Sequence, residues 1–179
     1  MLALAACGGG DDSADAPVPT EPAEPPAAAT ADCPATQLAF TNHETGTSGT
    51  ATAALATADR MGSPYLAYAA DHASEPSAVS SFYPTVPAGG NVVLVQFTTL
   101  SGEPAPYEPG MQLEWGQPGP TFLVIHVEGD QRFQTADEGQ TSGTLTVTAA
   151  AADVLCFEVD YRDGTVEVAG TVAAPIVGP

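Results

Sequence analysis

The chain has very little positive charge. Its 179 residues contain no lysine and only three arginines, against 22 acidic residues, which gives a formal net charge of −19. Nucleic-acid-binding proteins neutralise phosphates with Lys and Arg, and basic clusters attract anionic lipid headgroups in the same way. We therefore predict no nucleic-acid partner and no attraction to a membrane through surface charge. The acidic side chains are expected to keep the protein soluble.

Long apolar runs and catalytic motifs are also missing. No segment of the sequence reaches the roughly 20 apolar residues of a transmembrane helix, and no Gly-x-Ser-x-Gly nucleophile elbow is present. The acidic segments 128–130 and 137–139 lack the ligand spacing of an EF-hand loop. We therefore predict that the protein is not an enzyme and has no cofactor. Ca²⁺ is the ion that its carboxylates would suit if they held one.

The first of the three cysteines lies in a short apolar motif. Leu4-Ala5-Ala6-Cys7 resembles the lipobox of bacterial lipoproteins, and GGGDD follows it. The resemblance implies that Cys7 carries a lipid, which would hold the chain on the exported side of a cell-envelope membrane. The preceding residues include neither the basic n-region nor the full apolar h-region of a signal peptide. We therefore interpret residues 1–7 as a signal-peptide remnant and expect the start codon to lie upstream.

Two further segments complete the predicted organisation. Residues 8–32 are rich in Pro, Ala, Gly and acidic side chains, so they cannot bury enough apolar surface to fold and are predicted to be a disordered linker. Residues 33–179 are predicted to form a single domain. Cys33 and Cys156 remain as an even pair in an exported domain, for which a disulfide is the simplest assignment.

The sequence from residue 33 onward consists of short apolar or alternating runs separated by Gly, Pro, Asn and Asp. Helical periodicity is scarce, although the Ala-rich residues 51–59 are compatible with a short helix. This pattern predicts an all-β domain, an antiparallel β-sandwich with a small β-barrel as the alternative. The predicted strands cover residues 37–40, 49–58, 65–69, 77–83, 92–98, 121–127, 143–148, 154–161 and 165–172.

The last two predicted strands form a hairpin. Asp163-Gly164 is a signal for a two-residue type I′ turn. Such a turn would place the apolar side chains of both strands on one face and Cys156 on the other. The predicted pairs are Tyr161 with Val166, Val159 with Val168, Phe157 with Gly170 and Leu155 with Val172.

The segment that contains this hairpin carries a second resemblance. Residues 143–175, GTLTVTAAAADVLCFEVDYRDGTVEVAGTVAAP, resemble the C-terminal part of many uncharacterised bacterial β-sandwich lipoproteins. The resemblance covers about a fifth of the chain. It implies a fold and a location, and it implies no activity.

His126 is the histidine best placed for chemistry, because it lies in an apolar strand. His126 and Glu128 point to the same face of that strand and could supply two metal ligands. Zinc needs three or four ligands, and the sequence shows no further spacing that would supply them. We therefore favour a hydrogen-bonded strand histidine and predict no metal site.

Residues 99–120 form the candidate binding loop. This Pro- and Gly-rich connection is long for a compact domain, and it contains Tyr107 beside Glu108 and Glu114 beside Trp115, the only tryptophan. Aromatic faces with nearby carboxylates suit sugar rings or cationic groups.

The same residues have a second interpretation, which we favour. Met111, Leu113 and Trp115 alternate in the sequence, so they would form a short extra strand and bury the indole in the core.

These features predict a lipid-anchored binding or structural module of the cell envelope. The membrane would be contacted through the lipid alone, and a protein or a polysaccharide would dock on the 99–120 loop. One alternative is an acidic envelope-stability protein that holds cations without a specific ligand. The other is a hydrolase with an unrecognised site.

The lipid anchor can be tested by substitution. In cells that express the gene extended in frame to its upstream start codon, we expect Cys7→Ser to abolish labelling by a fatty-acid analogue, because the lipidated thiol is lost. The variant should also move from the membrane fraction to the soluble fraction. Unchanged membrane association of Cys7→Ser would contradict lipidation.

Overall fold

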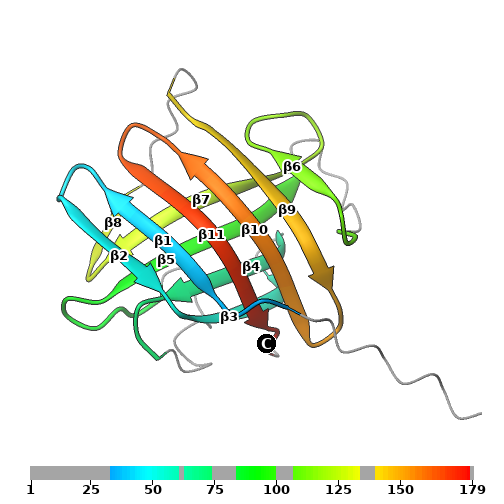
Figure 1. Ribbon diagram of the computed structural model, residues 1–179, viewed down its shortest axis with the longest axis horizontal. Helices are drawn as coiled ribbons and strands as arrows, with labels where there is room; N and C mark the ends of the chain where they lie inside the picture. The colour runs from blue at the N-terminus through cyan, green and yellow to red at the C-terminus, as the bar shows by residue number, and fades with distance from the viewer. Residues whose placement is uncertain (1–32, 61–62, 74–83, 100–106, 134–139, 178–179) are drawn as a thin grey trace, which may run out of the picture. The chain divides into compact units, whose positions relative to one another are not determined.

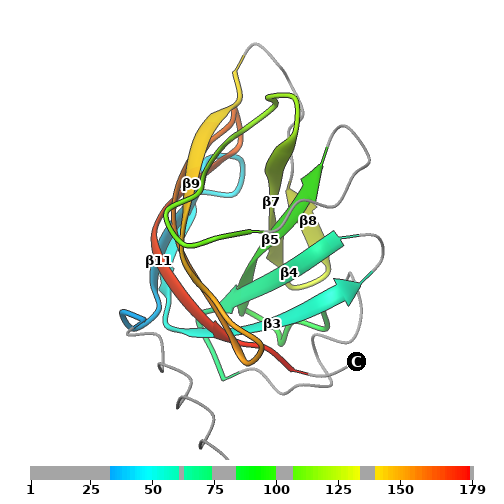
Figure 2. The same ribbon diagram turned by 90° about the vertical axis from the view of Figure 1, so that its right-hand side faces the viewer.

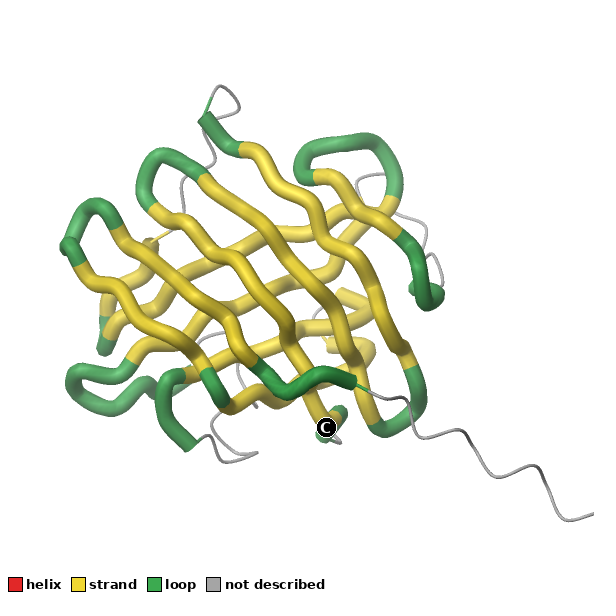
Figure 3. The backbone as a smooth tube through the Cα atoms, in the orientation of Figure 1, coloured by secondary structure: helices red, strands yellow, loops and turns green. Residues whose placement is uncertain are grey.

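The computed structural model describes residues 33–60, 63–73, 84–99, 107–133 and 140–177, and these ranges contain eleven β-strands and no helix (Figure 3). The predicted signal-peptide remnant 1–7, linker 8–32 and strand 77–83 lie outside the described residues. Within the described ranges, no helix is long and apolar enough to cross a membrane.

The strands form two antiparallel sheets that face each other as two layers, with their strands crossing at an angle (Figures 1 and 2). Sheet A, in the order β2-β1-β11-β10-β9-β6, contains β1 (Gln37–Asn42), β2 (Thr47–Ala51), β6 (Gln112–Glu114), β9 (Ser142–Ala150), β10 (Val154–Arg162) and β11 (Val166–Pro175). Sheet B, in the order β3-β4-β5-β7-β8, contains β3 (Ala53–Arg60), β4 (Ser63–Ala70), β5 (Asn91–Thr99), β7 (Pro120–Glu128) and β8 (Gln131–Phe133). The two sheets do not close into a barrel, so the predicted β-sandwich is confirmed.

The main core lies between the two sheets. Sheet A contributes alternate residues such as Leu145, Phe157 and Val168, while sheet B contributes Val95 and Phe122. The strands of sheet A therefore show the alternation of buried and exposed residues that one covered face requires.

Two of the three inner strands of sheet B, β5 and β7, are buried on both faces. Val93 and Val95 point toward sheet A, whereas Leu94, Ile125 and Val127 belong to a second apolar cluster on the opposite face. Continuous apolar runs are expected where a strand is covered on both sides, and the neighbouring strand β4 shows a similar run from Tyr65 to Ala70. The central position of β5 and β7 follows from that pattern.

The β10–β11 hairpin forms as predicted, but its predicted register is wrong by two residues. Tyr161 pairs with Val168 and Arg162 with Glu167. The Asp163 carboxylate accepts the backbone N–H groups of Thr165 (2.7 Å) and Val166 (2.6 Å). In a type I′ turn a backbone carbonyl oxygen would accept the N–H of Thr165, but here the side chain of Asp163 accepts it. The turn is therefore centred on 164–165. Because the shift is even, the same side chains point inward.

The predicted strand 49–58 divides at Thr52. β2 ends at Ala51 in sheet A, and β3 begins at Ala53 in sheet B. The Thr52 N–H donates to the carbonyl oxygen of Ala70 at the end of β4 (3.0 Å), which fixes the corner between the sheets. The Ala-rich segment is therefore strand and not helix, since β3 pairs with β4 from Ala53 to Arg60.

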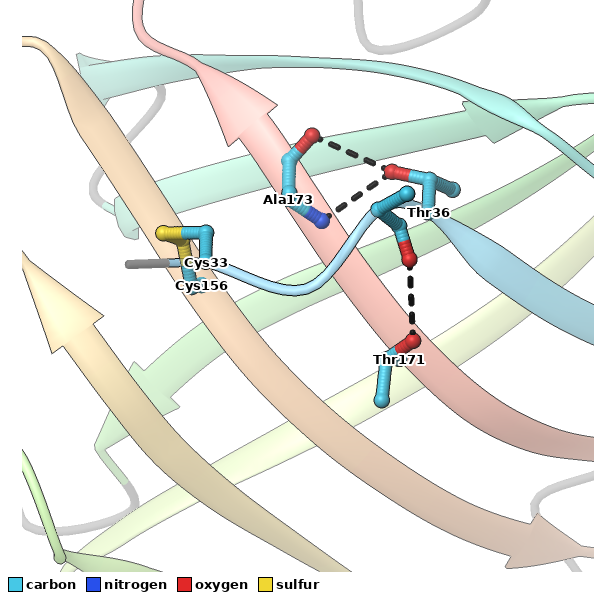
Figure 4. Close-up of a disulfide and its surroundings, with 6 residues drawn as sticks. Cys33, Thr36, Cys156, Thr171 and Ala173 are labelled. Atoms are coloured by element: carbon cyan, nitrogen blue, oxygen red, sulfur yellow. Dashed lines mark hydrogen bonds between the residues drawn. A yellow bond between two sulfur atoms is a disulfide. The ribbon is translucent and has the colours of Figure 1, made fainter. Parts of the chain in front are cut away.

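The predicted Cys33–Cys156 disulfide is present on the outer face of sheet A (Figure 4). The Cα atoms are 5.9 Å apart and the bond joins residues 123 positions apart in sequence. Beside it, Thr36 Oγ1 donates to the carbonyl oxygen of Ala173 (3.1 Å) and accepts that residue's N–H (3.0 Å). Residues 33–36 therefore lie across β10 and β11, held by the disulfide to β10 and by the Thr36 hydrogen bonds to β11.

At Gly170 the neighbouring strand β1 leaves no room for a side chain. Gly170 faces Leu38 of β1 and Val159 of β10, and its φ of 138° lies in a region that residues with a side chain rarely adopt. A Cβ at this position would overlap the carbonyl oxygen of Gln37. Only glycine therefore fits at position 170.

We expect Gly170→Ala to lower the free energy of unfolding by at least about 2 kcal/mol, because backbone strain adds to the steric overlap. Gly46→Ala is the matched control, since Gly46 also has a positive φ but has open space around its missing Cβ. Urea unfolding of both variants should show the larger loss for Gly170→Ala. Equal losses would show that the overlap with the carbonyl oxygen of Gln37 does not contribute to the loss of stability.

Candidate functional site: the Trp115 groove

The predicted extra strand in the 99–120 loop exists. β6 pairs with β9 at the edge of sheet A, with Leu113 opposite Leu145, and the carbonyl oxygen of Met111 accepts the N–H of Val147 (2.8 Å). Leu113 is fully buried, whereas Met111 and Trp115 are partly buried and pack against the same core. The favoured interpretation is therefore confirmed for the strand, and the indole is only half-buried.

Tyr107 belongs to the core. Its ring makes edge-on contacts with Phe97 (5.2 Å between centroids) and Tyr65 (6.0 Å), and its hydroxyl donates to the carbonyl oxygen of Thr98 (3.0 Å). Burial raises the pKa of the Tyr107 phenol to about 12. Because the ring packs between other aromatic rings, Tyr107 does not contribute an exposed face to a binding loop.

Glu108 and Glu114 are exposed. Neither of them lines the groove in which Trp115 lies. Glu108 accepts the N–H of Met111 through its carbonyl oxygen (3.0 Å) in the turn before β6. The structure therefore does not gather the four predicted residues into one surface: Trp115 lines one groove, and Glu114 lines a smaller hollow of about 280 Å³ beside it.

The groove beside Trp115 has a volume of about 620 Å³. It lies where β5 ends and β7 begins, and Thr98 faces Thr121 across these strands. Among the described residues its walls carry no charged side chain: they are formed by Thr98, Trp115, Gly116, Gln117, Thr121, Phe122, Leu123 and Thr141. The site thus combines one aromatic face with neutral hydroxyl and amide groups.

A tight connection holds the indole at this position. The backbone N–H of Trp115 donates to the carbonyl oxygen of Gly143 in β9 (3.0 Å). Thr121 Oγ1 donates to the carbonyl oxygen of Glu114 (2.8 Å). Gly116 and Gly119 have positive φ values of 72° and 99°, which glycine adopts without steric cost. The chain therefore turns directly from sheet A into β7 of sheet B.

Sequence reasoning missed the polar half of the groove. Thr98 and Thr121 come from the two predicted strands that flank the 99–120 loop, so a correct strand register would have brought them together. Gln117 lies within the loop but carries no pattern of its own. Thr141 approaches from a segment far along the chain, and no sequence signal points to it.

His126 is a hydrogen-bonded strand histidine. The imidazole is fully buried, and its nitrogens lie within hydrogen-bonding distance of Asn42 (3.2 Å) and Asn91 (3.1 Å). Desolvation lowers the pKa of His126, although Glu128 and Asp71 oppose this shift. In the part of the chain that the structure describes, no three His, Cys, Asp or Glu side chains gather as metal ligands.

Compared with known proteins, the chain matches no family model, no curated protein and no solved structure.

The position of Trp115 predicts that its acrylamide quenching, and the loss of stability on its substitution, lie between those of a fully buried and a fully exposed tryptophan. Because the indole packs on the core with one side at the groove, its emission should be quenched by acrylamide only in part. Trp115→Ala should cost about 1.5–3 kcal/mol of unfolding free energy, below the ~3–5 kcal/mol of a fully buried large aromatic. An unaltered urea midpoint in Trp115→Ala would show that the indole does not pack on the core.

Proposed function

We propose that the protein is a lipid-anchored binding module of the cell envelope, and that the Trp115 groove binds one ring of a neutral polysaccharide. The half-buried indole at the wall of a groove whose described lining carries no charged side chain supports this proposal. A fixed aromatic ring offers a large apolar face at little conformational cost, and an apolar wall with a few placed polar groups is the usual composition of a ligand site.

The polar groups of the groove favour a sugar over other ligands. The hydroxyl of Thr98 and the amide of Gln117 can exchange hydrogen bonds with sugar hydroxyls. The hydroxyl of Thr121 already donates to the carbonyl oxygen of Glu114, so it can act only as an acceptor. No carboxylate of the described lining is available to hold a cation. The net charge of −19 disfavours an anionic ligand.

The anchor and linker fit this role. A lipid on Cys7 would keep the module at the membrane, and residues 8–32 would let the domain reach away from it by up to roughly 3 Å per residue. The disulfide is consistent with an oxidising compartment outside the cytoplasm. The domain would act by attachment and not by catalysis.

Binding can be tested with an array of neutral and anionic glycans. We expect the wild-type domain to bind one class of neutral glycan with a change in its tryptophan fluorescence, which can come only from Trp115 because the chain has one tryptophan. Trp115→Ala should weaken this binding at least about tenfold, or about 1.4 kcal/mol. Thr98→Val should weaken it as well, because the substitution removes a hydroxyl at constant shape.

Met111→Ala is the matched control. Met111 is also half-buried in the same segment and packs on the same core, but it does not line the groove. Its substitution should lower stability and leave the glycan affinity unchanged. Equal binding by wild type and Trp115→Ala, or no binding by wild type, would refute the proposal.

A further inference from the structure

A chain of polar side chains, three buried and one exposed, crosses the sandwich at the end opposite the Trp115 groove. β5 and β7 are antiparallel, with Thr99 facing Pro120 at the groove end and Asn91 facing Glu128 at the other. At this second end His126 is enclosed between the rings of Phe40 and Phe133 (5.1 and 5.9 Å between centroids). We name the connected residues Asn42, His126, Asn91 and Asp71 the His126 latch.

The hydrogen bonds of the His126 latch can run in one direction only. Asn42 Oδ1 accepts the backbone N–H groups of Glu44 (3.0 Å) and Thr45 (3.3 Å), so its Nδ2 donates to Nδ1 of His126 (3.2 Å). At the other end Asn91 Nδ2 donates to Asp71 Oδ2 (2.8 Å). Asn91 Oδ1 must therefore accept from Nε2 of His126 (3.1 Å).

This direction assigns the state of the imidazole. His126 is neutral, with its proton on Nε2 and a lone pair on Nδ1. A second proton on Nδ1 would face the Nδ2 amide protons of Asn42. Rotating that amide by 180° would remove the acceptor of two backbone N–H groups, so the closed structure has no place for a proton on Nδ1.

The charged groups around His126 do not offset this conflict. Glu128 follows on β7, and Asp71, after β4, is paired with His72 (2.8 Å). Arg132 on β8 is exposed. The two carboxylates favour a protonated imidazole, but burial has the larger effect and lowers the pKa of His126. Asn42, Phe40, Asn91 and Phe133, the other side chains in contact with the ring, carry no charge.

The His126 latch joins the two sheets. Asn42 ends β1 of sheet A, whereas His126 lies in β7 of sheet B. A second polar connection lies beside it, because the hydroxyls of Thr45 and Thr47 each donate to a carboxylate oxygen of Glu128 (3.0 Å). Loss of the Asn42–His126 bond would therefore loosen the 43–46 turn and the contact between the sheets at this end.

We propose that the His126 latch is an acid-sensitive closure, which opens the Asp71 end of the sandwich in mild acid and leaves the Trp115 end closed. In the open state His126 is hydrated and titrates near its ordinary pKa of about 6.5. Above that pH His126 takes up no proton in either the open or the closed state, so the closed state keeps its full stability relative to the open one. Below it the open state is protonated first, and the opening equilibrium constant rises up to tenfold per pH unit.

Hydrogen exchange at single amides can measure this opening. The N–H groups of Glu44, Thr45 and Asn91 report on the latch end, because they are bonded to Asn42 and Asp71. The N–H groups of Gly110 and Trp115 report on the other end. Between pH 7.5 and 5.5 we expect protection factors to fall up to tenfold at the latch and to stay constant at Gly110 and Trp115.

His126→Gln is the test variant, since the glutamine amide keeps one acceptor and one donor but cannot take up a proton. The pH dependence at the latch should disappear in it. His43→Gln is the control, because His43 is exposed and pairs with Glu167 on sheet A (3.4 Å), and it should keep the wild-type response. If the protection factors at the latch fall as much in His126→Gln as in the wild type, the proposal is overturned.

A measurement on the wild-type protein covers the case in which His126→Gln does not fold. The imidazole nitrogen resonances should show a neutral ring protonated on Nε2 in the closed protein at pH 5.5. A protonated His126 at that pH with undiminished protection of the Glu44 and Thr45 amides would also overturn the proposal. It would show that the closed latch accommodates the proton.

Discussion

The ring of Phe97 connects the two sheets and the segment that forms the groove. It extends from β5 of sheet B and makes edge-on contacts with Phe157 of β10 in sheet A (5.3 Å) and with Tyr107 (5.2 Å). Such aromatic pairs add about 0.5–1.5 kcal/mol each beyond the burial of their surface. Because Tyr107 is held there, the chain that follows it reaches the edge of β9 and forms β6. The position of Trp115 therefore depends on an aromatic cluster in the core.

The two ends of the sandwich are closed by different physical means. At the Trp115 end the contacts are aromatic and apolar, and they do not change between neutral and mildly acidic pH. At the Asp71 end the space between the sheets is filled by an imidazole and two amides, which must all be hydrogen-bonded because burial makes an unpaired polar group costly. A domain built in this way would respond to acid at one end and keep the proposed ligand site at the other.

Most of the fold was predictable because the strands of this domain alternate or are continuously apolar. The failures have local causes. The hairpin register was wrong because the Asp163 carboxylate binds the turn amides itself, a competition that the Asp-Gly signal does not contain. β8 was missed because Gln131-Arg132-Phe133 contains one apolar residue and therefore shows no alternation, unlike the Met111, Leu113 and Trp115 pattern around β6. At the site, Trp115 was found from its residue type, but Tyr107 was misjudged because an aromatic residue in a loop can equally serve the core.

The edges of the sheets bear on the kind of partner the protein can bind. An exposed edge strand offers unpaired backbone groups to another chain, but β6 and β8 are each only three residues long. The edge of β3 is partly occupied, since the N–H of Val177 donates to the carbonyl oxygen of Ala56 (2.8 Å). Three of the four edges thus offer little room for strand addition. Recognition through side chains in a groove is the mode that this architecture leaves open beside β6, and the indole of Trp115 is the side chain placed there.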